Sequence, residues 1–169
     1  RADSPFSING EFRIARNTDT DHFGGALDEF KVWNKALSPS QIQEGMYCPP
    51  ACINEDLELY LPFEDGTPNG NNTSLNTVTD YSLNKHTANL NNFTLSGSAS
   101  NFVGGINNPQ VVDCGNTVIS DCDNHALDFD GINDYVALPE VSSSLTGFTF
   151  EAWYYYGGDA FLQRILDFN

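Results

Sequence analysis

The chain has 169 residues, 40% of them hydrophobic and 12% aromatic, which is enough to bury the core of one ordinary domain and argues against disorder. Its 23 acidic and 7 basic residues give a net charge of −16, which repels phosphate backbones and anionic lipid surfaces. No apolar run reaches about 18 residues. Nucleic acid and membrane insertion are therefore disfavoured, and cations are the natural partners.

The first predicted elements are two strands and a helix. Residues 12–14 alternate apolar and polar side chains, and GGALDEFKVW continues the strand pattern after a polar turn. Ser38 is a good N-cap for a helix, Pro39 suits the first helical position and Gln41 completes a capping box. We expect this helix to be short and to lie near residues 39–45.

Strand periodicity continues through the middle of the chain. In LELYLPF, residues 57–63, every second residue is apolar. From residue 66 to 101 the composition turns to Asn, Thr, Ser and Gly. The apolar residues of this part are spaced as short strands: Leu90, Phe93, Leu95 and Phe102. This part is predicted to form short strands and long polar loops.

The last part of the chain also has the strand period. HALDFDGINDYVAL, residues 125–138, is typical of two strands joined by a turn. FTFEAWYYY, residues 148–156, puts Thr149, Glu151, Trp153 and Tyr155 on one face and apolar side chains on the other. A strand that is aromatic on both faces fits the centre of a sandwich. The sequence predicts an all-β, antiparallel β-sandwich with one short helix.

The four cysteines form two close pairs, Cys48 with Cys52 and Cys114 with Cys122. Three disulfide connectivities are possible, and we favour the two local bridges. A zinc site is the alternative, but the C-x3-C and C-x7-C spacings are poor for zinc and no His flanks either pair. Disulfides, few Lys and many Asn and Thr suit an extracellular or cell-surface protein.

Two sets of motifs resemble one known family. FRIARNTDTDHFGGALDEFKVWNKALSPSQIQ resembles the C-terminal part of laminin-G-like, concanavalin A-like jelly-roll modules. ALDFDGINDYVALP, followed by FTFEAWYYY and ILDF, resembles the opening strands of the same family. The stretch between them looks like an extension found in secreted proteins of the Bacteroidetes, among them large gliding-adhesin-like surface adhesins and type IX secretion cargo.

The resemblance implies four parts: the C-terminal part of one module at 1–47, an Asn/Thr-rich β extension at 48–105, a linker with a Cys pair at 106–124, and the N-terminal part of a second module at 125–169. The C-terminal part of one module thus comes before the N-terminal part of another in the sequence. We expect a window from a tandem array of modules. The alternative is one circularly permuted sandwich, in which the early strands of the fold pair with late strands that come first.

The resemblance also implies a structural calcium ion. Acids near the GALDEF strand and in the DGxxDY turn of such modules sometimes hold Ca²⁺, and here they are Asp28, Asp130, Asn133 and Asp134. Asp28 shares strand parity with Phe30, so it is expected to point toward the core, where a carboxylate needs compensation. The alternative is that Asp28 caps backbone amides and the turn acids are solvated.

Aromatic residues are the candidate ligand-binding groups. Trp33, Trp153 and Tyr155 could stack on sugar rings, although such side chains more often serve packing. No catalytic residues are predicted, because the E-x-D-x-x-E pattern of glucan-cleaving relatives of the fold is missing. We therefore expect a non-catalytic adhesion segment that binds glycans or proteins or spaces such modules. The alternative is an accessory carbohydrate-binding module of a secreted glycoside hydrolase or peptidase.

Overall fold

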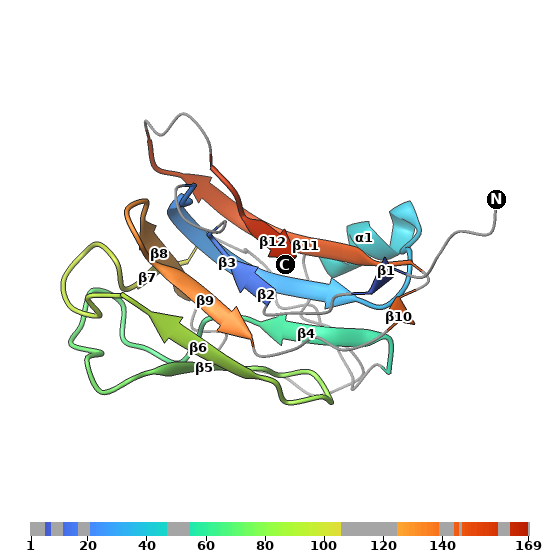
Figure 1. Ribbon diagram of the computed structural model, residues 1–169, viewed down its shortest axis with the longest axis horizontal. Coiled ribbons are helices and arrows are strands. Elements are labelled where there is room, and N and C mark those ends of the chain that lie inside the picture. The colour runs from blue at the N-terminus through green and yellow to red at the C-terminus, as the bar shows by residue number, and fades with distance from the viewer. Residues whose placement is uncertain are drawn as a thin grey trace.

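The computed structural model describes residues 6–7, 12–16, 21–46, 55–105, 125–138, 144–145, 147–158 and 163–168. Within these ranges the protein is all-β with one short helix, as predicted. Two five-stranded antiparallel sheets pack against each other, and a separate pair of two-residue strands lies beside them (Figure 1). The jelly-roll connectivity stays a prediction.

The elements follow one another in this order: β1 Phe6–Ser7, β2 Phe12–Ile14, β3 Gly24–Trp33, α1 Pro39–Gly45, β4 Leu57–Leu61, β5 Thr77–Thr79, β6 Thr87–Asn91, β7 Phe102–Gly104, β8 His125–Asp130, β9 Tyr135–Leu138, β10 Ser144–Leu145, β11 Thr149–Tyr156 and β12 Leu166–Phe168.

The first sheet is built around β3, its longest strand. β11 pairs with β3 from Gly25 to Trp33 on one side, so that β11 is an edge strand of the described sheet. On the other side β8 pairs with residues 24–27 and β4 with residues 30–33. Between these two partners Glu29 has a φ of 52°, and the register with β11 shifts there. This is a β-bulge in the middle of the central strand.

The second sheet has the order β12-β2-β9-β6-β5. In both sheets, strands of the first 47 residues pair with strands that come after residue 124: β3 with β8 and β11, and β2 with β9 and β12. Strands that are distant in the sequence thus share each sheet, and a permuted order relative to laminin-G-like modules stays a prediction. The assignment of the chain's four ranges to modules of an array stays a prediction.

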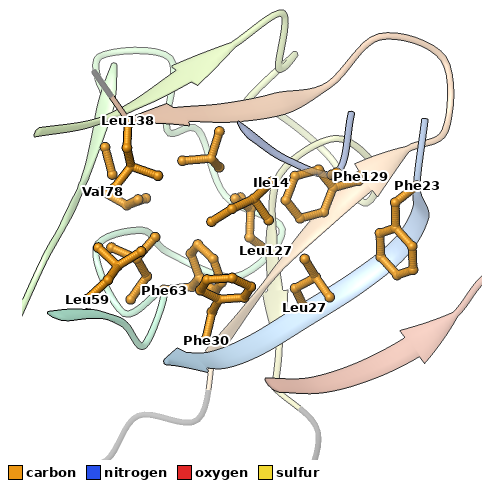
Figure 2. Packing of buried hydrophobic residues seen from close by; sticks show 14 of the residues in the cluster. Ile14, Phe23, Leu27, Phe30, Leu59, Phe63, Val78, Leu127, Phe129 and Leu138 are labelled. Atoms are coloured by element: carbon orange, nitrogen blue, oxygen red, sulfur yellow. The ribbon is translucent and has the colours of Figure 1, made fainter. Parts of the chain in front are cut away.

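The main hydrophobic core of the described residues lies between the two sheets (Figure 2). Leu27 and Phe30 reach it from β3, Leu59 from β4, Leu127 from β8 and Leu138 from β9. Each of these side chains is almost completely buried. Truncating one buried Leu to Ala typically lowers the free energy of unfolding by about 2 to 5 kcal/mol. This core is therefore a main source of the stability of the sandwich.

The helix α1 forms for local reasons. Ser38 Oγ accepts from the amide of Gln41 at 3.4 Å, and Gln41 Oε1 accepts from the amide of Ser38 at 2.9 Å, which is the predicted capping box. α1 lies beside β11 (Figure 1). No helix in the described ranges is long and apolar enough to cross a membrane.

The contact between β3 and β11 depends on one glycine, which gives a first prediction. Gly25 has a φ of +141°, and a Cβ built on it would lie 2.1 Å from the carbonyl oxygen of Tyr155. Gly25→Ala must therefore push β11 away from β3, and we expect a loss of about 2 kcal/mol or more in the free energy of unfolding, measured by urea denaturation.

Gly104→Ala is the matched control, because a Cβ at Gly104 meets no atom within 4 Å. This substitution should leave stability nearly unchanged. Equal midpoints for the two variants would contradict the close approach of the first and last parts of the chain.

Candidate functional site

A cavity of about 570 Å³ lies where α1 meets the first sheet. β11 supplies the largest share of its wall, with residues 150–154 and Tyr156, while α1 supplies Ile42 and Gly45 and Met46 follows as the C-cap of the helix. β3 adds two charged side chains at its bulge, Glu29 and Lys31. The cavity is of the size that small ligands use, and it combines aromatic walls with a few polar groups.

The bulge of β3 places one ion pair in the wall of this cavity. Lys31 Nζ lies 3.0 Å from Glu29 Oε2 and donates to the carbonyl oxygen of Gly45 at 3.2 Å. The hydroxyl of Tyr60 lies 2.9 Å from each carboxylate oxygen of Glu29. The side chain of Lys31 is only 3% exposed, and its ammonium is also 5.3 Å from the centre of the Tyr60 ring. The ammonium is thus fully engaged by groups of the protein.

A second carboxylate, that of Glu151, lies in the same wall. Its Oε2 accepts from the indole of Trp33 at 3.0 Å. A Cβ at Gly45 would lie 3.3 Å from this oxygen, so the last turn of α1 packs directly against the carboxylate. Glu29 and Glu151 carry two negative charges against the one positive charge of Lys31, which leaves this wall with a net charge of −1.

Most of the aromatic part of the wall comes from β11, and Phe23 adds one ring from just before β3. Trp153 is half-buried and donates from its indole to the carbonyl oxygen of Met46 at 3.2 Å, which holds the ring beside α1. Phe150, Tyr154 and Tyr156 also line the cavity and remain about half exposed or more. Such aromatic side chains can contact the apolar face of a ligand while their polar groups stay in water.

The three predicted ligand-binding aromatics have different surroundings. Trp153 lines the cavity. Trp33 is only 7% exposed and packs against Leu57 and Tyr60, so its role is packing and the hydrogen bond to the carboxylate. Tyr155 is 65% exposed and lies outside the cavity lining. The structure therefore does not bring the three together.

The predicted metal-binding residues Asp130, Asn133 and Asp134 lie in the turn between β8 and β9. Asp130 Oδ1 accepts from the amides of Ile132 at 2.8 Å and Asn133 at 3.3 Å, which closes the turn. Asp134 Oδ2 accepts from the amide of Asp130 at 3.0 Å, and the carbonyl oxygen of Asn133 accepts from Asn92 at 2.9 Å. The carboxylates thus organise the backbone of the turn.

Asp28, the fourth predicted ligand, lies away from this turn. Gly24 is the β3 partner of Asp130, and Asp28 is four residues further along β3, roughly 13 Å at about 3.3 Å per residue. Asp28 is buried, as expected, but the bulge at Glu29 places Leu27 rather than Asp28 beside Phe30 in the hydrophobic core. In the part of the chain that the structure describes, no group of three or more His, Cys, Asp or Glu could hold a metal ion. The calcium ion stays a prediction.

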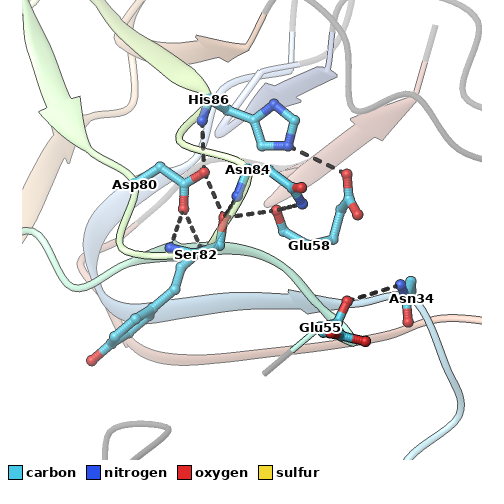
Figure 3. Close-up of polar contacts among 8 residues, drawn as sticks. Asn34, Glu55, Glu58, Asp80, Ser82, Asn84 and His86 are labelled. Carbon is cyan, nitrogen blue, oxygen red and sulfur yellow. Dashed lines mark hydrogen bonds and ion pairs between the residues drawn. The ribbon is translucent and has the colours of Figure 1, made fainter. Parts of the chain in front are cut away.

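A buried polar network joins β4 to the loop at 80–86 (Figure 3). Asp80 accepts from the amides of Tyr60 at 3.0 Å and His86 at 2.8 Å, and from the hydroxyl of Ser82 at 2.8 Å. The ring of His86 lies 3.3 Å from Glu58, and this hydrogen bond raises the pKa of His86 although burial lowers it. The ring contacts Glu58 rather than the hydroxyl of Ser82, so the network lacks the base–nucleophile contact of a hydrolase triad. Its role is to hold the loop.

Sequence reasoning missed the two carboxylates and the lysine of the cavity. Glu151 was assigned to the face of its strand that also carries Trp153, and this pairing was the available signal. Glu29 and Lys31 had none, because a bulge cannot be seen in the apolar pattern. The predicted disulfide residues Cys48, Cys52, Cys114 and Cys122 lie outside the described residues.

Comparison with known proteins gives no match: no family model, no curated protein and no solved structure resembles this chain closely enough to count.

The buried turn carboxylate gives a prediction about pH. Asp134 is fully buried, and burial raises its pKa from 3.8 to about 6, with smaller upward contributions from the charges of Asp130 and Asp128. Hydrogen bonds from Asp130 and Ser100 offset part of this shift. The folded state therefore favours the neutral acid. The contribution of this group to stability is greatest below pH 4, falls as the pH rises from about 4 to about 6, and stays low above that range.

Asp134→Asn removes the buried charge and keeps an oxygen that can accept from the Asp130 amide. We expect the variant to be more stable than the unmodified protein by about 1 to 3 kcal/mol near pH 7, and nearly equal to it near pH 4. Urea denaturation at both pH values measures this difference. A loss of stability near pH 7 that chelator abolishes would instead identify Asp134 as a ligand of a structural ion.

Proposed function

We propose that this chain is a non-catalytic glycan-binding segment of a secreted or cell-surface adhesin, and that the cavity beside α1 is its binding site. One observation supports the proposal above the others. The cavity combines Trp153 and the exposed aromatic residues of β11 with the carboxylates of Glu29 and Glu151.

This combination suits a sugar. Pyranose rings have apolar C–H faces that stack on aromatic rings, and hydroxyl groups that donate to carboxylates. The ring of Trp153 is held by its bond to Met46, and Glu29 is held by Tyr60 and Lys31. The polar and aromatic groups are thus fixed before a ligand arrives, which lowers the entropic cost of binding.

A binding role is favoured over a catalytic one by the partners of the two carboxylates. Glu29 is engaged by an ammonium and a phenol, and Glu151 by an indole. These contacts make both groups parts of a fixed wall. The absence of the E-x-D-x-x-E pattern points in the same direction.

The wider setting of the proposal comes from composition and from the resemblance to laminin-G-like modules. The acidic chain and its close cysteine pairs suit an extracellular location. An accessory carbohydrate-binding module of a secreted glycoside hydrolase or peptidase would use the same cavity. The full-length gene separates the two, because only the accessory module would share its polypeptide with a catalytic domain.

The binding site is tested with two aromatic substitutions on β11. Trp153→Ala removes a ring of the cavity wall, and we expect it to weaken glycan binding about tenfold or more. Tyr155→Ala removes a neighbouring exposed ring outside the cavity and should leave binding unchanged. A glycan array followed by calorimetry on the best ligand measures both effects.

Two results would contradict the proposal. The first is that the purified protein binds no glycan on the array. The second is that Trp153→Ala and Tyr155→Ala weaken binding equally, which would move the site to the outer aromatic surface of β11.

A further inference from the structure

We infer that the glycan bound in the cavity is cationic and carries free amino groups, as glucosamine polymers do. The inference rests on the proposed glycan-binding function and names the chemical class of its ligand. It follows from the net charge of the cavity wall. The proposed binding of a glycan does not by itself depend on that charge.

The first step is the charge balance of the wall. Lys31 supplies the one positive charge, and it is used by Glu29 at 3.0 Å and by the carbonyl oxygen of Gly45 at 3.2 Å. Glu151 receives only a neutral donor, the indole of Trp33. Its other oxygen, Oε1, is buried and accepts no hydrogen bond from the described part of the chain. Glu151 lies opposite Lys31 in the β3–β11 pairing, so the two carboxylates of the wall share one ammonium and one negative charge is left over.

The second step is the surroundings of this carboxylate. α1 packs against it at Gly45, and Trp153 lies on the same face of β11, two residues further along the strand. A charge shielded from water in this way acts more strongly on its surroundings than one on an open surface. An ammonium group in the cavity would balance it, and it need not touch Oε1 to do so.

The third step is the aromatic wall, which attracts the same kind of ligand. The faces of Trp and Tyr rings attract cations, and ammonium ions are bound in proteins by such rings together with a carboxylate. Both rings line the cavity, Trp153 from the face of β11 that carries Glu151 and Tyr154 from the opposite face. A net charge of −16 on the chain also draws cations toward the protein and repels acidic glycans.

An amino sugar therefore has a chemical group for each of the three features argued above, the aromatic ring and the two carboxylates. Its ring can stack on Trp153, its hydroxyls can donate to Glu29, and its ammonium balances Glu151. A neutral, N-acetylated sugar of the same length would keep the stacking and leave the charge unbalanced. Acidic sugars would add a second negative charge to the wall.

The test compares a glucosamine tetramer with an N-acetylglucosamine tetramer of the same linkage, by calorimetry in a buffer that keeps the amines protonated. We expect the glucosamine tetramer to bind at least about tenfold more tightly, and its affinity to fall as ionic strength rises. Glu151→Gln keeps an acceptor for Trp33 and should remove most of this preference.

Glu44→Gln is the matched control. It makes the same change of charge on an exposed residue of α1 outside the cavity lining, and both affinities should stay as they were. Thermal melting shows whether Glu151→Gln is folded. If it is not, the salt dependence of the unmodified protein decides, since stacking alone would give almost none.

The outcomes separate the inference from the function on which it rests. Equal affinity for the two tetramers, or a preference for the N-acetylated one, overturns the inference and leaves glycan binding intact. Binding of neutral glycans alone, with loss in Trp153→Ala, does the same. Binding of a lysine oligopeptide with no binding of either tetramer overturns both, in favour of a basic protein partner.

Discussion

The structure depends on β3 being paired along both of its edges. Eight of its ten residues are buried, so their backbone groups need hydrogen-bond partners, and three separate strands supply them: β11 on one side, and β8 and β4 in succession on the other. Those partners come from the middle and the end of the chain. Without β3, the described strands of the first sheet would lose the element that joins them.

The bulge at Glu29 connects this constraint to the proposed site. β8 and β4 meet the same edge of β3, and the extra residue lies where one partner gives way to the other. It shifts the alternation of side chains, so that Glu29 and Lys31 line the cavity while Leu27 and Phe30 stay in the core. The irregularity that lets one strand serve two partners thus also supplies the charged wall.

The sequence could predict the helix and the strands, because these depend on residues that are close together along the chain. The capping residues Ser38 and Gln41 defined α1, and the alternation in HALDFDGINDYVAL defined β8 and β9. Pairing partners could not be predicted in this way, because any apolar strand face fits several others. The sequence could not show that Leu27 joins Phe30 in the core, because the bulge between them arises from contacts across strands. The cavity could not be predicted for the same reason, because its wall is formed by residues of α1, β3 and β11 that are distant in the sequence.

The pairing of β3 also determines when the first sheet can fold. Gly24 meets Asp130, and Trp33 meets Thr149, so the main partners of the central strand are more than a hundred residues away. Contacts this distant close large loops and form late. While the chain is being made, β3 can pair only with β4, along residues 30–33, until β8 and β11 follow. The sandwich is therefore completed as one cooperative unit only once β11 has been made, and a chain that stops before β8 leaves most of β3 without partners.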